Sequence, residues 1–296
     1  TKDSLAVWLK ALSAQQRATV AAQKFEGAPG EQAIVPDGDH WFVVAGVSDP
    51  QALGTWCLAK LAETLPAGTY RLADGEKGPV LPGKAAFGWL SGQYRFDRYR
   101  SDPAEDKPRI LLSKEARAID AVLAEAAAVE LVRDLVNTPA EDMGPAELES
   151  AALQLAKAHR AELRVTKGDA LEQDFPMVHM VGRAASRSHA PRMIELEWGN
   201  PAHPKLAIIG KGVCFDSGGL DIKPSSAMLL MKKDMGGAAH ALALAGLIME
   251  RGLKVRLHLL VPAVENAVSG NAFRPGDVLR SRAGISVEIG NTDAEG

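Results

Sequence analysis

Helical and strand-forming segments alternate along the second half of the chain, and this alternation limits the folds that the sequence can adopt. The helices are expected at residues 146–160 and 234–252, and strands at residues 162–166, 192–199, 205–210 and 254–264, of which residues 205–210 form a short buried strand. Strands that alternate with helices form a parallel or mixed sheet with helices on both faces. We therefore predict an α/β fold with a mixed, mostly parallel sheet flanked by helices.

The first third of the chain carries a smaller set of the same elements. Helical periodicity runs through residues 4–24, a strand is expected at residues 41–45 and a helix at residues 49–65. Residues 67–108 are interrupted by Gly and Pro and end in a charged run, which is typical of loops near a domain boundary. These patterns predict a small α/β unit that ends in a loop-rich region.

A long helix is expected between Ser113 and Pro139, where few residues interrupt the helical pattern. A helix of about 24 residues spans about 36 Å, which is long enough to link two domains. We therefore predict an N-terminal α/β domain at residues 1–112, and a linker helix with a second, catalytic domain at residues 113–296.

The composition restricts the partners and the compartment of the protein. The 34 basic and 37 acidic residues give a net charge of −3, whereas nucleic-acid-binding proteins carry a basic excess. Cys57 and Cys214 are too few for a disulfide framework. No apolar run reaches the length of a membrane span, and the N-terminus lacks the apolar core of a signal peptide. We expect a soluble, cytoplasmic protein with no membrane partner, for which nucleic acid is an unlikely ligand.

The stretch GKGVCFDSGGLDIKP at residues 210–224 admits three interpretations. A dinucleotide-binding loop requires a third glycine at the position of Phe215 and a helix after the turn, and the sequence supports neither. Serine catalysis by Ser217 would need the elbow sequence G-x-S-x-G, in which Phe215 again replaces a glycine. In the third interpretation Asp216 is a metal ligand. The serine hydrolase remains an alternative at this point.

Four carboxylates support the metal interpretation because each lies among small residues. They occur in FDSGG, KDMGG and NTDAEG, and are Asp216, Asp234, Asp293 and Glu295. Each one alone is explained as a turn or cap residue, but ligands gather where the strands of an α/β sheet end. Four converging carboxylates repel one another unless cations bind or their pKa values rise. Oxygen donors with a nitrogen donor suit two divalent ions such as Zn²⁺ or Mn²⁺.

Several motifs in order resemble the leucyl aminopeptidase family, the cytosolic two-metal aminopeptidases. They are GKGVCFDSGGLDIKP, MKKDMGGAAH, SGNAFRPGDV and NTDAEG within residues 206–296, with RDLVNTPAEDMGP as a supporting match upstream. The intervals of five residues from Lys211 to Asp216, eighteen to Asp234 and fifty-nine to Asp293 also fit the family. The resemblance implies a metal-dependent exopeptidase that releases N-terminal, apolar amino acids from peptides.

The resemblance also assigns roles to individual residues. It implies two divalent ions held by Lys211, Asp216, Asp234, Asp293 and Glu295, with Asp216 and Glu295 shared by both ions. A water between the ions would be the nucleophile, because metal coordination lowers its pKa.

The substrate-facing residues follow from the same resemblance. Lys223 would be the catalytic lysine that polarises the scissile carbonyl. Met231 would line the pocket for the first side chain, and Asn291 would contact the peptide backbone. The family also assembles as a homohexamer and uses a bicarbonate ion, held by an arginine that would follow Gly296.

The arginine that would hold the bicarbonate ion follows the last residue of the sequence. We expect a C-terminally shortened form with little activity of its own. A catalytically impaired fragment, or a DNA-binding or structural relative, is the alternative to the enzyme. The net charge of −3 and the complete set of metal ligands argue against that alternative.

Overall fold

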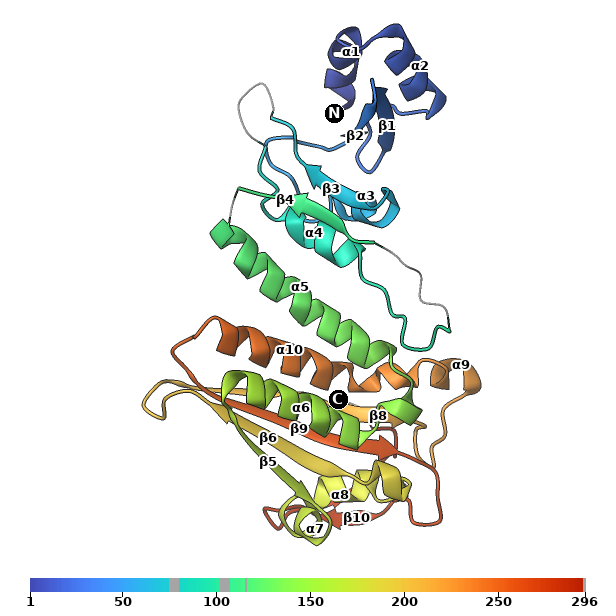
Figure 1. The fold of residues 1–296 in the computed structure, drawn as a ribbon. Coiled ribbons are helices and arrows are strands. Elements are labelled where there is room, and N and C mark those ends of the chain that lie inside the picture. The colour runs from blue at the N-terminus through green and yellow to red at the C-terminus, as the bar shows by residue number, and fades with distance from the viewer. Residues whose placement is uncertain (75–79, 102–106, 115, 295–296) are drawn as a thin grey trace. The chain divides into compact units, whose positions relative to one another are not determined.

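The structure is a computed structural model that describes residues 1–74, 80–101, 107–114 and 116–294. The chain forms two compact units, Thr1–Ala127 and Ala128–Gly296 (Figure 1). None of the described helices is both long and apolar enough to cross a membrane.

The N-terminal unit is built on a β-hairpin whose two faces pack against different helices. Its elements are α1 Lys2–Lys10, α2 Ala14–Ala22, β1 Gln32–Asp37, β2 His40–Ala45, α3 Ala59–Thr64, β3 Gly68–Arg71, α4 Ala85–Gly92 and β4 Arg109–Leu112. β1 pairs antiparallel with β2, and β3 pairs parallel with β4. Successive side chains of a strand face opposite sides. Ala33 and Val35 therefore pack with Val20 of α2, while Ile34 and Val43 pack with the cluster of α3 and α4.

Three expectations for this unit need correction. The segment expected to be helical from residue 4 to 24 is two helices, because Ser13 and Gln16 form a capping box that starts α2. Only Ala59–Thr64 of the helix expected at residues 49–65 is helical. The loop expected at residues 67–108 contains β3 and α4. The α4 helix lacks an amphipathic pattern because most of its surface is buried, so its sequence gives no period to detect.

The second unit is organised around a five-stranded sheet. Its elements are α5 Ala116–Asn137, which begins before the unit boundary, η1 Ala140–Asp142, α6 Pro145–His159, β5 Glu162–Lys167, α7 Asp169–Asp174, α8 Pro176–Gly182, η2 Arg187–His189, β6 Arg192–Trp198, β7 Lys205–Ile209, β8 Gly212–Asp216, α9 Ser225–Met228, η3 Met231–Met235, α10 Gly236–Glu250, β9 Arg256–Asn266, β10 Val278–Arg280 and β11 Ser286–Glu288. β10 and β11 form a separate hairpin.

The direction of the strands agrees with the predicted sheet. The order is β5-β6-β9-β7, and β8 also pairs with β9. β6 is antiparallel to β5 and to β9, while β7 and β8 are parallel to β9, so every strand except β6 runs the same way. Helices α6 and α10 lie over one side of this sheet, and α8 contacts β6 and β9 from the other (Figure 1). The predicted α/β fold with a mixed, mostly parallel sheet is confirmed.

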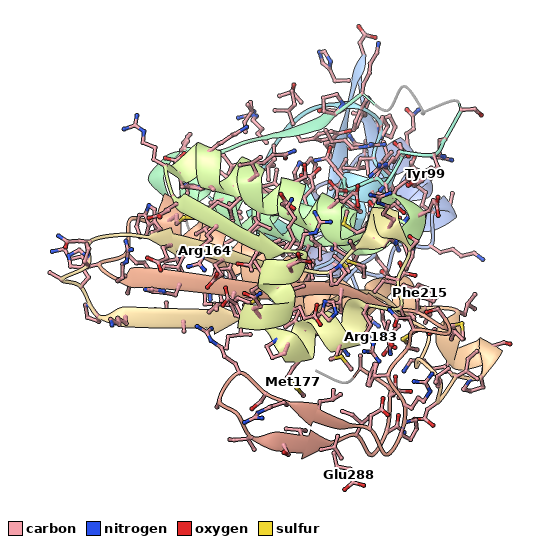
Figure 2. All side chains as sticks on the ribbon, turned by 90° about the horizontal axis from the view of Figure 1, so that it is seen from below. Tyr99, Arg164, Met177, Arg183, Phe215 and Glu288 are labelled. Carbon is pink, nitrogen blue, oxygen red and sulfur yellow. The ribbon has the colours of Figure 1, made fainter. Side chains whose placement is uncertain are left out.

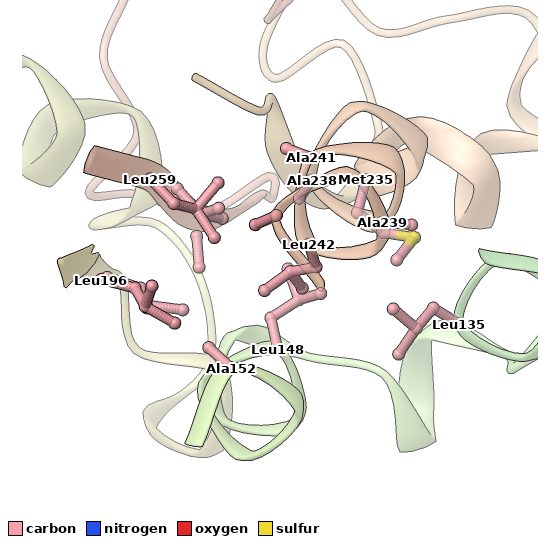
Figure 3. Packing of buried hydrophobic residues seen from close by; sticks show 14 of the residues in the cluster. Leu135, Leu148, Ala152, Leu196, Met235, Ala238, Ala239, Ala241, Leu242 and Leu259 are labelled. Carbon is pink, nitrogen blue, oxygen red and sulfur yellow. The ribbon is translucent and has the colours of Figure 1, made fainter. Parts of the chain in front are cut away.

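The core of the second unit lies between the sheet and helices α6 and α10. Leu148 of α6, Leu196 of β6, Leu259 of β9 and Leu242 of α10 are almost fully buried and meet in this layer (Figure 3). Burial of about 25 cal/mol per Å² of apolar surface makes this layer the main source of stability for the unit. It also fixes α10, whose first turn lies beside the candidate site.

We expect the substitution Leu242→Ala to lower the free energy of unfolding by about 2–5 kcal/mol, because it removes buried methyl groups and leaves a cavity. Leu242 is 1% exposed, whereas Leu244 on the same helix is 50% exposed. Leu244→Ala is therefore the matched control. Urea unfolding of both variants measures the difference, and equal losses would show that α10 does not pack as described.

Candidate metal centre

The site begins where β7 ends and β8 starts. These two strands lie one after the other along the same edge of β9. β7 pairs with the first half of β9 and β8 with its last residues. A Cβ atom on Gly210 would lie 2.7 Å from the Ala238 Cα atom, so only glycine lets α10 approach this junction closely. The Ala238 N–H donates to the Lys211 carbonyl at 2.9 Å. Gly210 therefore serves helix packing and places Lys211 at the start of α10, whereas Gly212 allows the close approach of β9, because a Cβ atom on it would lie 2.5 Å from the Pro262 carbonyl oxygen.

Lys211 is paired with a carboxylate from the turn before α10. Its Nζ lies 3.1 Å from Asp234 Oδ2, and both side chains are largely buried. Asp234 lies within η3, so it is not the residue that precedes α10. Lys232 of the same turn donates to the carbonyl of Asn137 at the end of α5, at 2.7 Å. The contact joins the RDLVNTP and MKKD segments and fixes the turn that carries Asp234.

Asp216 is the most buried of the candidate ligands. It ends β8, directly after Phe215 (labelled in Figure 2), and its side chain is 1% exposed. Its Oδ1 accepts hydrogen bonds from Gly218 N and Asn266 Nδ2, each at 2.8 Å. Its Oδ2 lies 3.6 Å from Lys223 Nζ and accepts no hydrogen bond from the described residues. Burial raises the pKa of the Asp216 carboxyl, and the neighbouring Asp293 carboxyl raises it further.

The segment that carries Asp293 folds back against the end of β8. Lys223 Nζ forms a short hydrogen bond with Asp293 Oδ1, and this bond lowers the pKa of Asp293. The neighbouring Thr292 is fully buried. Its Oγ1 donates to the Gly218 carbonyl at 2.7 Å, and its N–H donates to Asp221 Oδ2 at 2.8 Å. These bonds hold Asp293 beside Asp216, although 77 positions separate them in the sequence.

The structure thus gathers four of the five expected metal ligands into two groups. One holds Lys211 with Asp234, and the other holds Lys223 with Asp216 and Asp293. The fifth, Glu295, lies outside the described residues. Within residues 1–74, 80–101, 107–114 and 116–294, three or more His, Cys, Asp and Glu side chains nowhere come close enough together to hold a metal ion. Each group contains a lysine amine among its polar atoms.

The other expected site residues have less defined surroundings. Met231 is half-buried at the first position of η3. Asn291 is exposed, and its Oδ1 accepts from Asp293 N at 2.7 Å. Ser217 is buried, and both its hydroxyl partners are backbone atoms: the Oγ donates to the Asn266 carbonyl at 2.7 Å and accepts from Gly219 N at 3.1 Å. These bonds give Ser217 a structural role and no general base.

The polar atoms around Asp216 fit divalent cations. Asp216 Oδ2 and Asp234 Oδ2 are buried and accept no hydrogen bond from the described residues, which is costly for a carboxylate unless a cation is near. In each case the nearby cation is a lysine ammonium. Carboxylate oxygens with an amine nitrogen are suitable ligands for Zn²⁺ or Mn²⁺. The residues present are therefore compatible with bound metal.

Three uncharged residues, a glycine among them, shape this site. Gly219 has φ of +65°, and a Cβ atom on it would lie 3.0 Å from both Asn266 Oδ1 and Thr292 Oγ1. Roles for Asn266 and Thr292 were not predicted from the sequence, because the predicted site rested on charged residues. The available signal for Asn266 was a polar residue at the end of an apolar strand.

Comparison with known proteins places both units in one family. Residues 130–296 match the model of the cytosol aminopeptidase family, catalytic domain. Residues 1–113 match the model of the M17 aminopeptidase, N-terminal domain. A probable cytosol aminopeptidase from Wolinella succinogenes is 36% identical over 292 residues, which cover 92% of this chain and 60% of that protein. Peptidase B from Yersinia pestis is 46% identical over 176 residues, which cover 57% of this chain and 40% of that protein.

Solved structures give the same result. The crystal structure of the cytosol aminopeptidase from Coxiella burnetii superposes with a TM-score of 0.89 at 42% identity, over 99% of this chain and 63% of that one. The bottromycin maturation enzyme BotP in complex with Mn superposes with a TM-score of 0.81 at 34% identity, over 96% of this chain and 63% of that one. The chain thus spans less than two thirds of the length of each of these relatives.

Proposed function

The chain belongs to the cytosol aminopeptidase family, and from this we propose that it carries the metal centre of an aminopeptidase that releases N-terminal, apolar amino acids from peptides. The observation that carries the proposal is the surroundings of Asp216. A 1% exposed carboxylate has one oxygen without a hydrogen bond from the described residues, and the Lys223 ammonium and the Asp293 carboxylate lie beside it. If the role of this buried carboxylate were only structural, a neutral residue would serve it better.

We assign two divalent ions, Zn²⁺ or Mn²⁺, to Lys211, Asp216, Asp234, Asp293 and Glu295. The relative BotP has been solved in complex with Mn, which supports a divalent ion at this site. When bound, such ions supply Lewis-acid polarisation of a carbonyl and lower the pKa of a water molecule. Lys211 Nζ would be the nitrogen donor among these ligands.

The remaining residues act on the substrate. Lys223 Nζ would offer a positive charge to the oxygen of the scissile carbonyl, where negative charge develops. Its side chain is 11% exposed, so little water screens that charge. Met231 presents an apolar surface to the first side chain of the peptide, and Asn291 binds the peptide backbone. A bicarbonate ion would act as the general base.

The proposal extends to the setting of the reaction. We place the enzyme in the cytoplasm because relatives in the family are cytosol aminopeptidases. From the resemblance to the leucyl aminopeptidase family we also expect a homohexamer that acts on peptides. We assign residues 1–112 to the N-terminal domain and residues 113–296 to the linker helix and catalytic domain.

The test of this function uses a peptide with leucine at its N-terminus and the same peptide with an acetylated N-terminus. We expect the purified whole protein, supplied with Mn²⁺ or Zn²⁺, to release leucine from the free peptide only, because an exopeptidase of this class needs the free amine. Mass spectrometry measures the products. Internal cleavage, or equal cleavage of both peptides, would contradict the proposal.

We expect Ser217→Ala to leave this activity largely unchanged, because the hydroxyl contacts only backbone atoms. Its loss should cost about 1–3 kcal/mol of stability, because two hydrogen bonds are lost and the buried Gly219 N–H loses this acceptor. Measurement of kcat/KM on the free peptide checks this. Loss of a serine nucleophile lowers turnover by about 10⁶-fold, and a fall of that size would restore the serine hydrolase alternative.

A further inference from the structure

Asn266 occupies a central position between the two segments that carry Asp216 and Asp293. It is the last residue of β9, is 1% exposed, and is the register partner of Asp216 on β8. Its carbonyl accepts from both the N–H and the Oγ of Ser217, at 3.1 and 2.7 Å. The backbone of Asn266 is therefore fixed by the sheet, and its side chain projects from a rigid support.

The orientation of the Asn266 amide is determined by its partners. Nδ2 lies 2.8 Å from Asp216 Oδ1 and 2.8 Å from the Thr292 carbonyl oxygen. Both partners are acceptors, so the nitrogen and not the oxygen must face them. Both N–H groups of the amide are used, one on each segment. The amide oxygen then faces Gly219, where a Cβ atom would lie 3.0 Å from it.

This arrangement decides which oxygen of Asp216 is free. Oδ1 accepts from Gly218 N and from Asn266 Nδ2, so it is held by two donors. Oδ2 accepts no hydrogen bond from the described residues and is the oxygen beside Lys223. Without the Asn266 donor, the carboxylate would lose one of the two bonds that prevent its rotation.

The same amide also fixes the position of Asp293. The second N–H of Asn266 Nδ2 holds the carbonyl of Thr292, the residue before Asp293. A single uncharged side chain therefore restrains two acidic residues, which reach the site from distant parts of the sequence. Lys223 also reaches both acidic residues, as an ion-pair partner of each.

We propose that Asn266 is a positioning residue for the metal centre, which holds Asp216 with Oδ2 directed at the ions and holds Asp293 beside it. The inference rests on the proposed function, because it requires that Asp216 and Asp293 bind metal. Residues that orient metal ligands through hydrogen bonds typically contribute 10–100-fold to metal affinity. Asn266 itself touches neither substrate nor metal in this role.

The test compares metal binding by Asn266→Leu with that by the wild-type protein. Leucine has a similar branched shape and fills the same space, but it donates no hydrogen bond. Ser217→Ala is the matched control, because it removes a buried hydrogen bond to the backbone of the same residue and leaves the Asp216 carboxylate untouched. Titration calorimetry with Mn²⁺ alone gives the affinity, and thermal unfolding of the metal-free proteins shows whether each is folded.

We expect folded Asn266→Leu to bind Mn²⁺ about 10–100-fold more weakly than the wild type, and Ser217→Ala to bind it as the wild type does. If the leucine variant does not fold, Asn266→Ser, which keeps one donor, should give a smaller but measurable loss. Unchanged affinity in whichever variant folds would overturn the inference alone. Absence of Mn²⁺ binding by the wild type would instead overturn the proposed function and this inference together.

Discussion

Replacement of Asp216 by asparagine is expected to abolish metal binding and to lower kcat/KM by at least about 10³-fold, the size of effect seen when a single electrostatic contribution to the transition state is lost. Asparagine keeps an acceptor for Gly218 N and Asn266 Nδ2, so the hydrogen bonds that hold the loop survive. It removes the negative charge that would hold a dication. The loss should therefore be specific to the metal.

Asp216→Ala is a less specific variant and shows why asparagine is preferred. Alanine would leave two buried donors without an acceptor, at a cost of about 1–3 kcal/mol each. Reduced activity in that variant would then reflect stability as well as metal loss. The asparagine variant should instead unfold near the temperature of the metal-free wild type.

Elemental analysis after gel filtration, together with the leucine-release assay, measures both effects of Asp216→Asn. Asp169→Asn is the matched control, because Asp169 is exposed in the first turn of α7 and makes the same change of charge. The control should keep the metal content and activity of the wild type. Normal metal content in Asp216→Asn would show that Asp216 is not a metal ligand.

Much of the second unit could be predicted from sequence because its elements have strong periodicity. β9 and α10 are long, apolar and bounded by charged residues or glycine, so their positions were predicted to within a few residues. The carboxylates of the site were recognisable only as a set of four and through the motifs that carry them, because each one alone is explained as a turn or cap residue. Their roles as metal ligands remain predictions, and Glu295 lies outside the described residues.

Contacts between residues far apart in the chain could not be predicted from the sequence. Nothing in the local pattern around Asn266 or Thr292 indicates that the Asn266 amide meets the Thr292 carbonyl, because this contact joins two segments that lie 26 positions apart in the sequence. The division of residues 4–24 into two helices depended on a side-chain cap at Ser13, which a periodic pattern does not reveal. Periodicity reports burial, whereas contacts between uncharged polar groups depend on tertiary structure.

The two interpretations of the segment GKGVCFDSGG that competed with the metal centre are disfavoured for separate structural reasons. Gly210 is required by the close approach of Ala238, which explains the glycine without a phosphate ligand. Ser217 bonds only to backbone atoms, which explains the serine without a catalytic base. The remaining feature that packing does not explain is the buried charge of Asp216, and this charge supports a cation site.

Substitution of Lys223 by methionine is expected to separate catalysis from metal binding. Lys223 Nζ lies 3.6 Å from Asp216 Oδ2 and forms a hydrogen bond with Asp293 Oδ1, so its positive charge competes with dications for the same carboxylates. Removal of that charge should leave Mn²⁺ affinity equal to or higher than that of the wild type. Activity should still fall, by about 10²–10³-fold in kcat, because the charge that stabilises the developing oxyanion is lost.

Titration calorimetry with Mn²⁺ and steady-state kinetics on the same preparations would check both parts of this prediction. Lys205→Met, at the exposed start of β7, makes the same change at a distance from the site and should alter neither value. A Lys223 variant that loses metal and activity together would make the lysine a structural partner of Asp216 and Asp293. A variant that keeps both the metal affinity and the activity of the wild type would show that Lys223 does not stabilise the oxyanion. A cation that acts in the transition state must affect kcat even when the metal content is unchanged.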